Sequence, residues 1–336
     1  MPSGKPGGQL FKMFSIPLKH IQRTERIGSD ADDPAIWIPN AAGGRFYILG
    51  TNKASASEGG SIVVLDDAGS LRLKIDKIER PNNIHVIHGM RTIRGRIDIA
   101  ISTERLTSRL RIWELTLNGS TPAAKELIPS DNGILFRGES GDAAAPMGVT
   151  GAVARDSQAD IYVSRKSGPR QGYVHHLRLN LMTTRPTITF VRAIVEFSGT
   201  KEMEALAISG DQKLLYAADE RFGIHRIRLS DGMPVGIISG KPFQGDQEGI
   251  ASVRIGGKRV VICTDQIPGA SRYFVYDERN PAAPMGVFTG QSDETDGIDA
   301  SDRVHTAQYP NGILVAMHSA GACFDYYALP ERLPRT

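Results

Sequence analysis

The sequence contains only two cysteines, Cys263 and Cys323, each within a short apolar stretch. That count excludes a disulfide framework, and we expect two buried free thiols. Long apolar runs are absent as well. The longest uncharged run near the C-terminus, Gly312–Phe324, is too short to cross a bilayer, so we expect no transmembrane helix.

Several motifs that mark common enzyme classes are missing. The chain has no HExxH, no GxSxG, and no phosphate-binding glycine pattern between a strand and a helix. His175 and His176 alternate faces of one expected strand, so one of them should be buried. The three arginines Arg91, Arg94 and Arg96 suggest a hairpin turn more than a nucleic-acid patch, and the net charge is only +3.

Long helical periodicity is also scarce, whereas 36 Gly and 19 Pro among 336 residues favour many short turns. Short β-branched and aromatic runs recur in pairs across a turn. Six such pairs follow one another: FYILGTNK with SIVVLD, IDIAISTER with LRIWEL, DIYVSRK with GYVHHLRL, LLYAADE with GIHRIRL, RVVICTDQ with RYFVYD, and GILVAMH with FDYYAL. The pattern is typical of an all-β protein.

Another short segment precedes each pair by roughly twenty residues, which completes a repeating unit. The equivalent positions Asp33, Asn83, Met147, Glu204, Glu248 and Asp296 are spaced by 50, 64, 57, 44 and 48 residues. Such periods predict a six-bladed β-propeller, with an irregular sandwich as the alternative. We expect residues 1–15 to form an N-terminal arm or closing strand and residues 16–336 to form one propeller domain.

Equivalent strand ends of a propeller converge on one axial channel, so residues at one phase of the repeat form a ring. The first ring, where each inner strand begins, holds Asp32 and Asp33, Asn83, Met147, Glu204, Glu248 with nearby Asp246, and Asp296. The second ring, at the ends of the next strands, holds Lys53, Arg105, Lys166, Glu220, Gln266 and His318.

These rings predict a combined metal and phosphate site. Clustered carboxylates repel one another unless cations neutralise them, and hard oxygen ligands in this number suit calcium better than zinc. Lysine and arginine are good receptors for phosphate, as a point charge and as a bidentate fork respectively. Cations and metal-binding carboxylates around one cavity would fit a phosphorylated substrate.

The sequence resembles the β-propeller phytases, calcium-dependent phosphatases that act on inositol hexakisphosphate. The most specific segment is DADDPAIW at residues 30–37. Further similar segments follow in the same order: TNK at 51–53, NN at 82–83, ISTER ending at 105, RKSG at 165–168, the MEA segment around Glu204, LYAADE ending at Glu220, DQEG at 246–249 and TDGID at 295–299.

The resemblance implies a role for each matching residue. The calcium ligands would be Asp32, Asp33, Glu204, Glu220, Asp246, Glu248 and Asp296, and the catalytic residues would be Glu204, Asp246 and Glu248. The receptors for substrate phosphate would be Lys53, Asn83, Arg105 and Lys166. A calcium-bound water would attack the phosphorus atom, with several calcium ions in the site.

Four positions differ from the family's pattern. Met147 replaces a phosphate-contacting tyrosine, and His85 replaces an aspartate after the paired asparagines. Gly290 stands near a missing earlier Asp-Gly pair, and Met317-His318 replaces Gln-Asp, which removes an expected structural calcium site.

Two other functions stay open: a non-catalytic propeller that binds a phosphorylated ligand or a protein, and a calcium-dependent lactonase or esterase. The resemblance implies a monomer with a small phosphorylated substrate, without nucleic acid or membrane partners. It also implies a secreted or periplasmic protein. The N-terminal residues show no apolar run of signal-peptide length, so either the protein stays inside or the chain begins after a removed segment.

Overall fold

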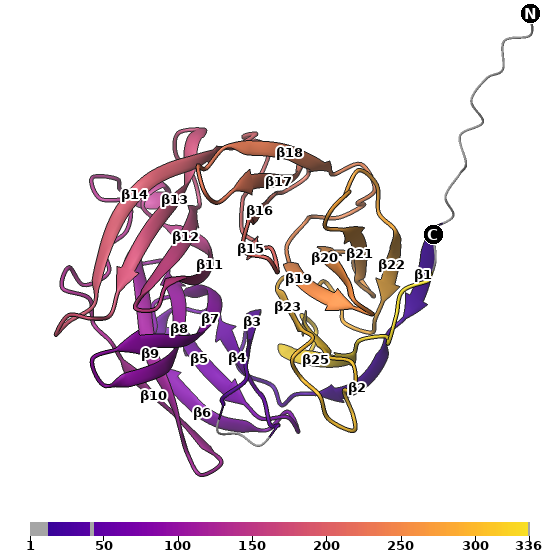
Figure 1. The fold of residues 1–336 in the computed structure, drawn as a ribbon, viewed down its shortest axis with the longest axis horizontal. Helices are drawn as coiled ribbons and strands as arrows, with labels where there is room; N and C mark the ends of the chain where they lie inside the picture. Colours follow the sequence, from indigo (N-terminus) through magenta and orange to yellow (C-terminus); the bar gives the residue numbers. More distant parts are fainter. Residues whose placement is uncertain (1–12, 41–43, 335–336) are drawn as a thin grey trace, which may run out of the picture.

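The strands of the protein form six sheets arranged as a ring, so the prediction of a six-bladed β-propeller is confirmed (Figure 1). The computed structural model describes residues 13–40 and 44–334. Most of the predicted N-terminal arm, residues 1–12, lies outside the described residues, and the division into arm and domain stays a prediction. The described chain contains no helix that could span a membrane.

The first three blades are consecutive four-stranded antiparallel sheets. The first comprises β3 (Ala31–Trp37), β4 (Tyr47–Asn52), β5 (Ser61–Leu65) and β6 (Leu71–Asp76). The second comprises β7 (Pro81–Thr92), β8 (Gly95–Glu104), β9 (Arg109–Asn118) and β10 (Thr121–Glu126). The third comprises β11 (Pro146–Arg155), β12 (Gln158–Arg165), β13 (Gln171–Asn180) and β14 (Thr187–Glu196).

The last three blades continue the same order around the ring. The fourth comprises β15 (Leu206–Ile208), β16 (Leu214–Asp219), β17 (Gly223–Arg228) and β18 (Pro234–Ser239). The fifth comprises β19 (Ile250–Ile255), β20 (Lys258–Asp265), β21 (Arg272–Asp277) and β22 (Gly286–Thr289). The sixth begins with β23 (Ile298–Ser301), β24 (Ile313–His318) and β25 (Cys323–Ala328). Two short 3₁₀ helices, η1 (Ala56–Glu58) and η2 (Gly141–Ala143), lie in connections.

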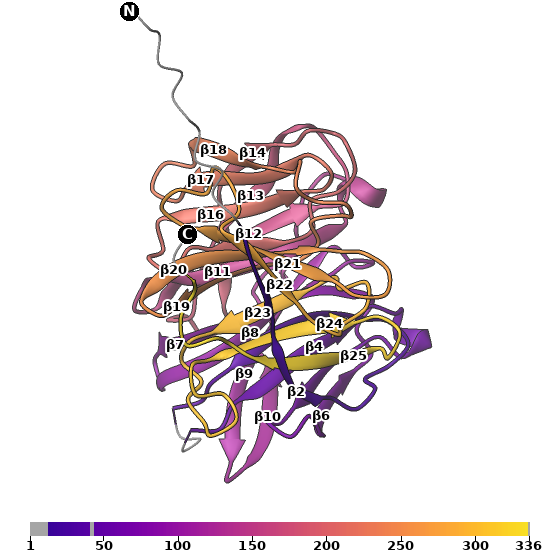
Figure 2. The ribbon, with the colours of Figure 1, turned by 90° about the vertical axis from the view of Figure 1, so that its right-hand side faces the viewer.

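The N-terminal segment completes the ring. The strand β2 (Lys19–Arg23) pairs antiparallel with β25 as the outer strand of the sixth blade, and β1 (Phe14–Pro17) pairs in parallel with β22. Figure 2 shows this indigo segment beside the orange and yellow strands of the last two blades. The first and last parts of the chain therefore share one sheet, which joins the ring.

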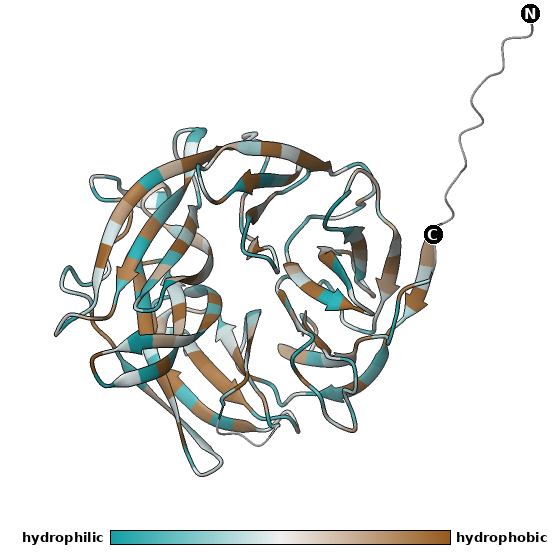
Figure 3. Cartoon of the chain, in the orientation of Figure 1, coloured by the Kyte–Doolittle hydropathy of each residue, from teal (hydrophilic) through white to brown (hydrophobic). Residues whose placement is uncertain are grey.

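The core consists of six clusters of buried apolar side chains, each lying between two neighbouring blades. Strand β5 (SIVVL) is buried along its whole length, whereas other strands alternate apolar and polar residues, which Figure 3 shows as brown and teal segments. Trp37 and Trp113, for example, pack in the cluster between the first and second blades. Both cysteines are buried free thiols, which confirms that prediction.

A buried carboxylate, Asp325 on β25, reinforces the pairing of β2 with β25 through side-chain hydrogen bonds. It accepts hydrogen bonds from Arg23 on β2 at 2.7 and 2.9 Å and from Ser292 at 2.9 Å. Burial alone would raise the pKa of Asp325, but the hydrogen bonds from Arg23 and Ser292 hold that pKa below its usual value. The ionised carboxylate thus ties the N-terminal strand to the last blade.

We expect Asp325→Ala to lower the free energy of unfolding by about 3 kcal/mol, because it leaves buried donors without an acceptor. Denaturant unfolding followed by tryptophan fluorescence measures this loss. The matched control is Asp76→Ala, which removes an exposed pair with Lys74 (2.8 Å) and should cost less than about 1 kcal/mol. Equal losses in the two variants would contradict this view of the closure.

Candidate functional site

The two predicted rings come together around one end of the axial channel. The first-ring residues lie in or just before the innermost strands β3, β7, β11, β15, β19 and β23, and the second-ring residues lie at or just after the ends of β4, β8, β12, β16, β20 and β24. A cavity of about 340 Å³ lies along these inner strands, and Asp33, Asn83 and His85 contribute to its lining.

A repeated hydroxyl group sets the position of the rings in the first three blades. Thr51, Thr103 and Ser164 each lie two residues before a second-ring cation. Their hydroxyl groups donate to a main-chain carbonyl of the next blade, at Asn82 (2.8 Å), Met147 (2.6 Å) and Met203 (2.6 Å) respectively. The same hydroxyl groups accept main-chain N–H bonds from their own inner strands. Each blade thereby fixes the first-ring segment of its neighbour.

Two glycines allow the inner segments to approach closely. A Cβ atom at Gly148 would overlap the main-chain carbonyl of Glu204, and one at Gly297 would overlap Asp33. Only glycine leaves room for these contacts. The glycines that follow Met147 and Asp296 therefore belong to the construction of the site.

The centre of the site is Glu204, which is surrounded by cationic groups. Lys53 lies 3.6 Å from its Oε1 atom and also pairs with Asp32. Burial alone would raise the pKa of Glu204, but the charge of Lys53, a hydrogen bond from Asn82 and the charges of Arg105 and Lys166 hold that pKa below its ordinary value. Three of the predicted phosphate receptors thus keep one carboxylate ionised.

Asn82 links this carboxylate to the second blade. Its Nδ2 atom donates to Glu204 Oε1 at 2.6 Å, and its Oδ1 atom accepts from Arg105 at 3.1 Å. Asn82 also donates to Asn83, one of the predicted phosphate receptors, at 2.7 Å. The sequence interpretation assigned no role to Asn82, although its pairing with Asn83 was a signal.

Three other carboxylates of the site, Glu248, Glu220 and Asp296, are poorly compensated by positive charge. Burial and the charges of Glu204, Glu220 and Asp296 raise the pKa of Glu248 well above its usual value. Burial, together with neighbouring carboxylates, raises the pKa of Glu220 to about 7 and that of Asp296 to about 6. The buried Oδ2 atom of Asp32 has no hydrogen-bond partner among the described residues. The site therefore carries a surplus of buried negative charge.

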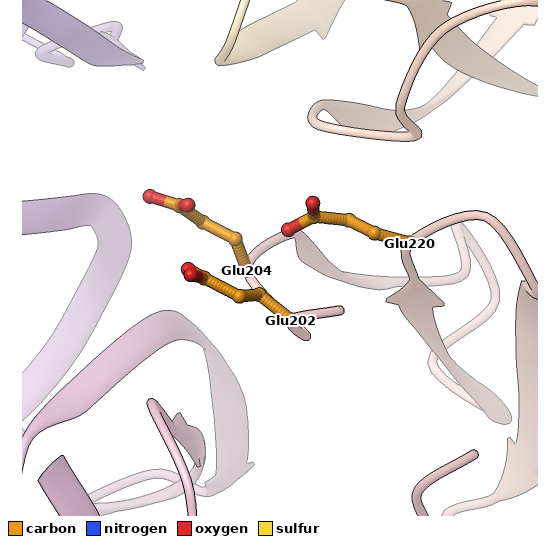
Figure 4. A group of neighbouring side chains, drawn as sticks. All are labelled: Glu202, Glu204 and Glu220. Carbon is orange, nitrogen blue, oxygen red and sulfur yellow. The ribbon is translucent and has the colours of Figure 1, made fainter. Parts of the chain in front are cut away.

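Among the described residues, two groups of three carboxylates could hold a metal ion. Within each group, one oxygen atom from each residue lies within 4.8 Å of the others. The first is Glu202, Glu204 and Glu220; in Figure 4, Glu202 and Glu204 extend in the same direction and Glu220 extends toward them. This group of hard oxygen atoms fits a cation such as calcium. Asp32, which shares the ammonium group of Lys53 with Glu204, has an oxygen atom without a hydrogen-bond partner among the described residues. The second is Glu220, Asp246 and Glu248, and the ammonium group of Lys201 already lies among its oxygens.

Some predicted residues lie apart from these groups. Asp33 accepts a hydrogen bond from the main-chain N–H of Ile84 at 2.9 Å and lines the cavity. Met147 is fully buried, and burial lowers the pKa of His85 to about 4, so that its imidazole is neutral at pH 7. His318 accepts a hydrogen bond from Asp293 N–H at 3.0 Å in the sixth blade. Met147, His85 and His318 therefore lie outside the two carboxylate groups defined by the structure.

Sequence reasoning missed three further charged residues of the site. Glu202 pairs with Lys166, Lys201 contacts three carboxylates, and Arg221 donates a hydrogen bond to Asp246 at 2.8 Å. Glu202, Lys201 and Arg221 do not occupy the ring positions of the repeat, so the comparison of blades could not select them. Their proximity to Glu204 and Glu220 in the sequence was the available signal.

The fold and the site define a six-bladed propeller with an acidic, cation-lined axial site. The phytase family model matches residues 16–136, which span the closing strand β2 and the first two blades. This match confirms the resemblance to the β-propeller phytases. Asp32, Asp33, Lys53, Asn83 and Arg105 lie within the matched part, whereas the carboxylates of the later blades lie beyond it.

Two solved structures are similar over nearly the whole chain. A structure of BBS1N in complex with ARL6DN has a TM-score of 0.52 at 12% identity and covers 95% of this chain and 99% of that one. The β-propeller domain of Cps50 (Swd1) from Myceliophteria thermophila has a TM-score of 0.48 at 8% identity, with 89% and 84% covered. At such identities the likeness to BBS1N concerns the fold alone.

The surplus charge predicts how stability depends on pH in a chelator. A carboxyl whose pKa is raised by folding holds its proton in the folded state, so it favours folding at low pH, and this contribution is lost as the pH rises through the raised pKa. Glu220 and Glu248 therefore make the protein less stable at pH 8 than at pH 6. We expect Glu248→Gln to reduce this loss by about 1.4 kcal/mol or more, which corresponds to one pKa unit.

Denaturant unfolding at pH 6 and pH 8 in EGTA measures the difference. The comparison of wild type with Glu248→Gln isolates this carboxylate, because the two proteins differ at no other titratable group. The control is Glu25→Gln at an exposed position, which should leave the pH dependence unchanged. An equal pH dependence of stability in wild type and Glu248→Gln would show that Glu248 does not cause the loss of stability at pH 8.

Proposed function

We propose that the protein is a calcium-dependent phosphomonoesterase that hydrolyses inositol hexakisphosphate. The observation that carries the proposal is Glu204, a buried and ionised carboxylate flanked by Lys53, Arg105 and Lys166. A metal-binding carboxylate and three phosphate receptors at one point suit a substrate that carries many phosphate groups. The family match over residues 16–136 supports the same reaction class.

The residues of the first carboxylate group are suited to hold the metal. Glu202, Glu204 and Glu220, with Asp32 beside them, would provide oxygen ligands from the first and fourth blades. When bound, calcium supplies Lewis-acid stabilisation of phosphoryl oxygens and a more acidic bound water. The proposed metal roles of Asp33 and Asp296 rest on the family resemblance alone.

The cationic residues would bind and orient the substrate. Lys53 and Lys166 are paired with Asp32 and Glu202, so neutralisation of these carboxylates by a metal would release both ammonium groups for phosphate. Arg105 is held by Asn82 and would contribute a bidentate contact. Their positive charges would stabilise the negative charge that develops on the phosphoryl oxygens during transfer.

The direct test is phosphate release from inositol hexakisphosphate in calcium and in EGTA. We expect release in calcium only, and a loss of about 10³-fold in kcat/KM for Glu204→Gln, because the neutral amide neither holds a cation nor anchors the lysines. Glu25→Gln is the matched control and should retain activity. Full activity in EGTA would contradict the mechanism. Tight binding without turnover would instead establish a non-catalytic binding propeller.

A second variant separates substrate binding from the metal. We expect Arg105→Met to raise KM for inositol hexakisphosphate about tenfold or more, because a charge-assisted hydrogen bond to phosphate is lost, while calcium binding measured by calorimetry stays unchanged. The control is Arg72→Met, which removes a surface arginine on the outer strand β6. An unchanged KM in Arg105→Met would exclude Arg105 from the phosphate site.

A further inference from the structure

Lys201 occupies the centre of the second carboxylate group, Glu220, Asp246 and Glu248. It lies in the connection between β14 and β15, three residues before Glu204. Its Nζ atom is 2.6 Å from Glu220, 2.7 Å from Asp246 and 3.4 Å from Glu248. The three carboxylates are nearly inaccessible to solvent, with 1%, 11% and 8% of their side-chain surface exposed.

The ammonium group is surrounded by three carboxylate groups, as a bound calcium ion would be. A calcium ion bound by the same three residues would need oxygen atoms at about 2.3–2.6 Å. The ammonium group already lies nearly that close to two of them, so the ion and the ammonium group cannot share the space. Arg221 adds a second positive charge, because its Nε atom donates to Asp246 at 2.8 Å.

The charges of the two groups differ in consequence. Burial alone would raise the pKa of Asp246, but hydrogen bonds from Arg221 and Lys201 hold it below its usual value. The second group thus has one ammonium group in contact with all three of its carboxylates, and it shares Glu220 with the first group. In the first group, the other cations each pair with one carboxylate: Lys166 with Glu202, and Lys53 with Glu204 at 3.6 Å. Lys53 also pairs with Asp32, whose Oδ2 atom has no hydrogen-bond partner among the described residues.

We propose that Lys201 is the resident cation of the Glu220–Asp246–Glu248 group and takes the place of a calcium ion there. The site then holds its metal in the first group, around Glu204, and binds fewer ions than its carboxylates alone would allow. Asp246 and Glu248 act as partners of Lys201 and not as metal ligands in the wild-type protein. This inference deepens the proposed function, since it concerns the metal content of the same site, but its test requires no turnover.

Calcium titration of the purified protein by isothermal calorimetry tests the proposal, with wild type, Lys201→Met and Lys213→Met compared. Lys213 is the matched control because its side chain is 78% exposed and its Nζ atom makes only a long contact, 3.8 Å, with Asp211 Oδ2. We expect Lys201→Met to bind one more calcium ion per chain than wild type, or to bind calcium about tenfold more tightly at one site. Lys213→Met should match wild type.

Identical stoichiometry and affinity in wild type and Lys201→Met would overturn the proposal. Should Lys201→Met fold only in calcium, equilibrium dialysis followed by metal analysis counts the ions retained. One ion more than wild type then supports the proposal, and an equal number overturns it. Lys201→Arg keeps the positive charge and should retain the wild-type count, so an extra ion in this variant would also overturn it.

The same titration separates this inference from the proposed function. A wild-type protein that binds no calcium would contradict calcium dependence, whereas the difference between wild type and Lys201→Met would still report on Lys201. Conversely, calcium binding by wild type with no gain in Lys201→Met would leave the proposed phosphatase intact and remove only the role given to Lys201.

Discussion

Buried negative charge at the end of the axial channel is the constraint on which the rest of the site depends. Desolvated carboxylates from several blades cannot all be ionised side by side without cations between them. Lysines and arginines lie around Glu204 and Asp246, yet the pKa values of Glu248 and Glu220 remain raised. We expect this surplus charge to destabilise the metal-free protein and to favour the binding of a cation.

The propeller holds this costly arrangement in place through contacts between blades. Hydroxyl groups on Thr51, Thr103 and Ser164 donate hydrogen bonds to the inner segments of the second, third and fourth blades. Apolar clusters fill the interfaces between neighbouring sheets. The joint between β2 and β25 completes the ring. Each apolar cluster is shared by two neighbouring blades, so the packing of the whole ring provides the free energy that offsets the repulsion between the carboxylates.

The sequence was sufficient to predict the six sheets, because each blade repeats a pair of apolar strands across a turn. It also located the ring residues, since the repeat fixes where strands begin and end. It could not predict which charge pairs with which. Lys201 lies in a connection that the repeat does not govern, and the contacts of Asn82, at the start of β7, depend on the direction of its side chain. The adjacent residues Asp32 and Asp33 illustrate this limit. Asp32 pairs with Lys53, whereas Asp33 accepts a hydrogen bond from the main-chain N–H of Ile84, and the sequence alone does not distinguish the two.

The most direct test of the central claim is a crystal structure with calcium and myo-inositol hexasulfate, a substrate analogue whose sulfate groups resist hydrolysis. The account predicts anomalous density for a metal ion bound by Glu204 and its neighbours, with a sulfate group against Lys53, Arg105 or Lys166. A hexasulfate bound elsewhere on the propeller, with Glu204 free of metal, would contradict the claim that one axial site joins metal and phosphate.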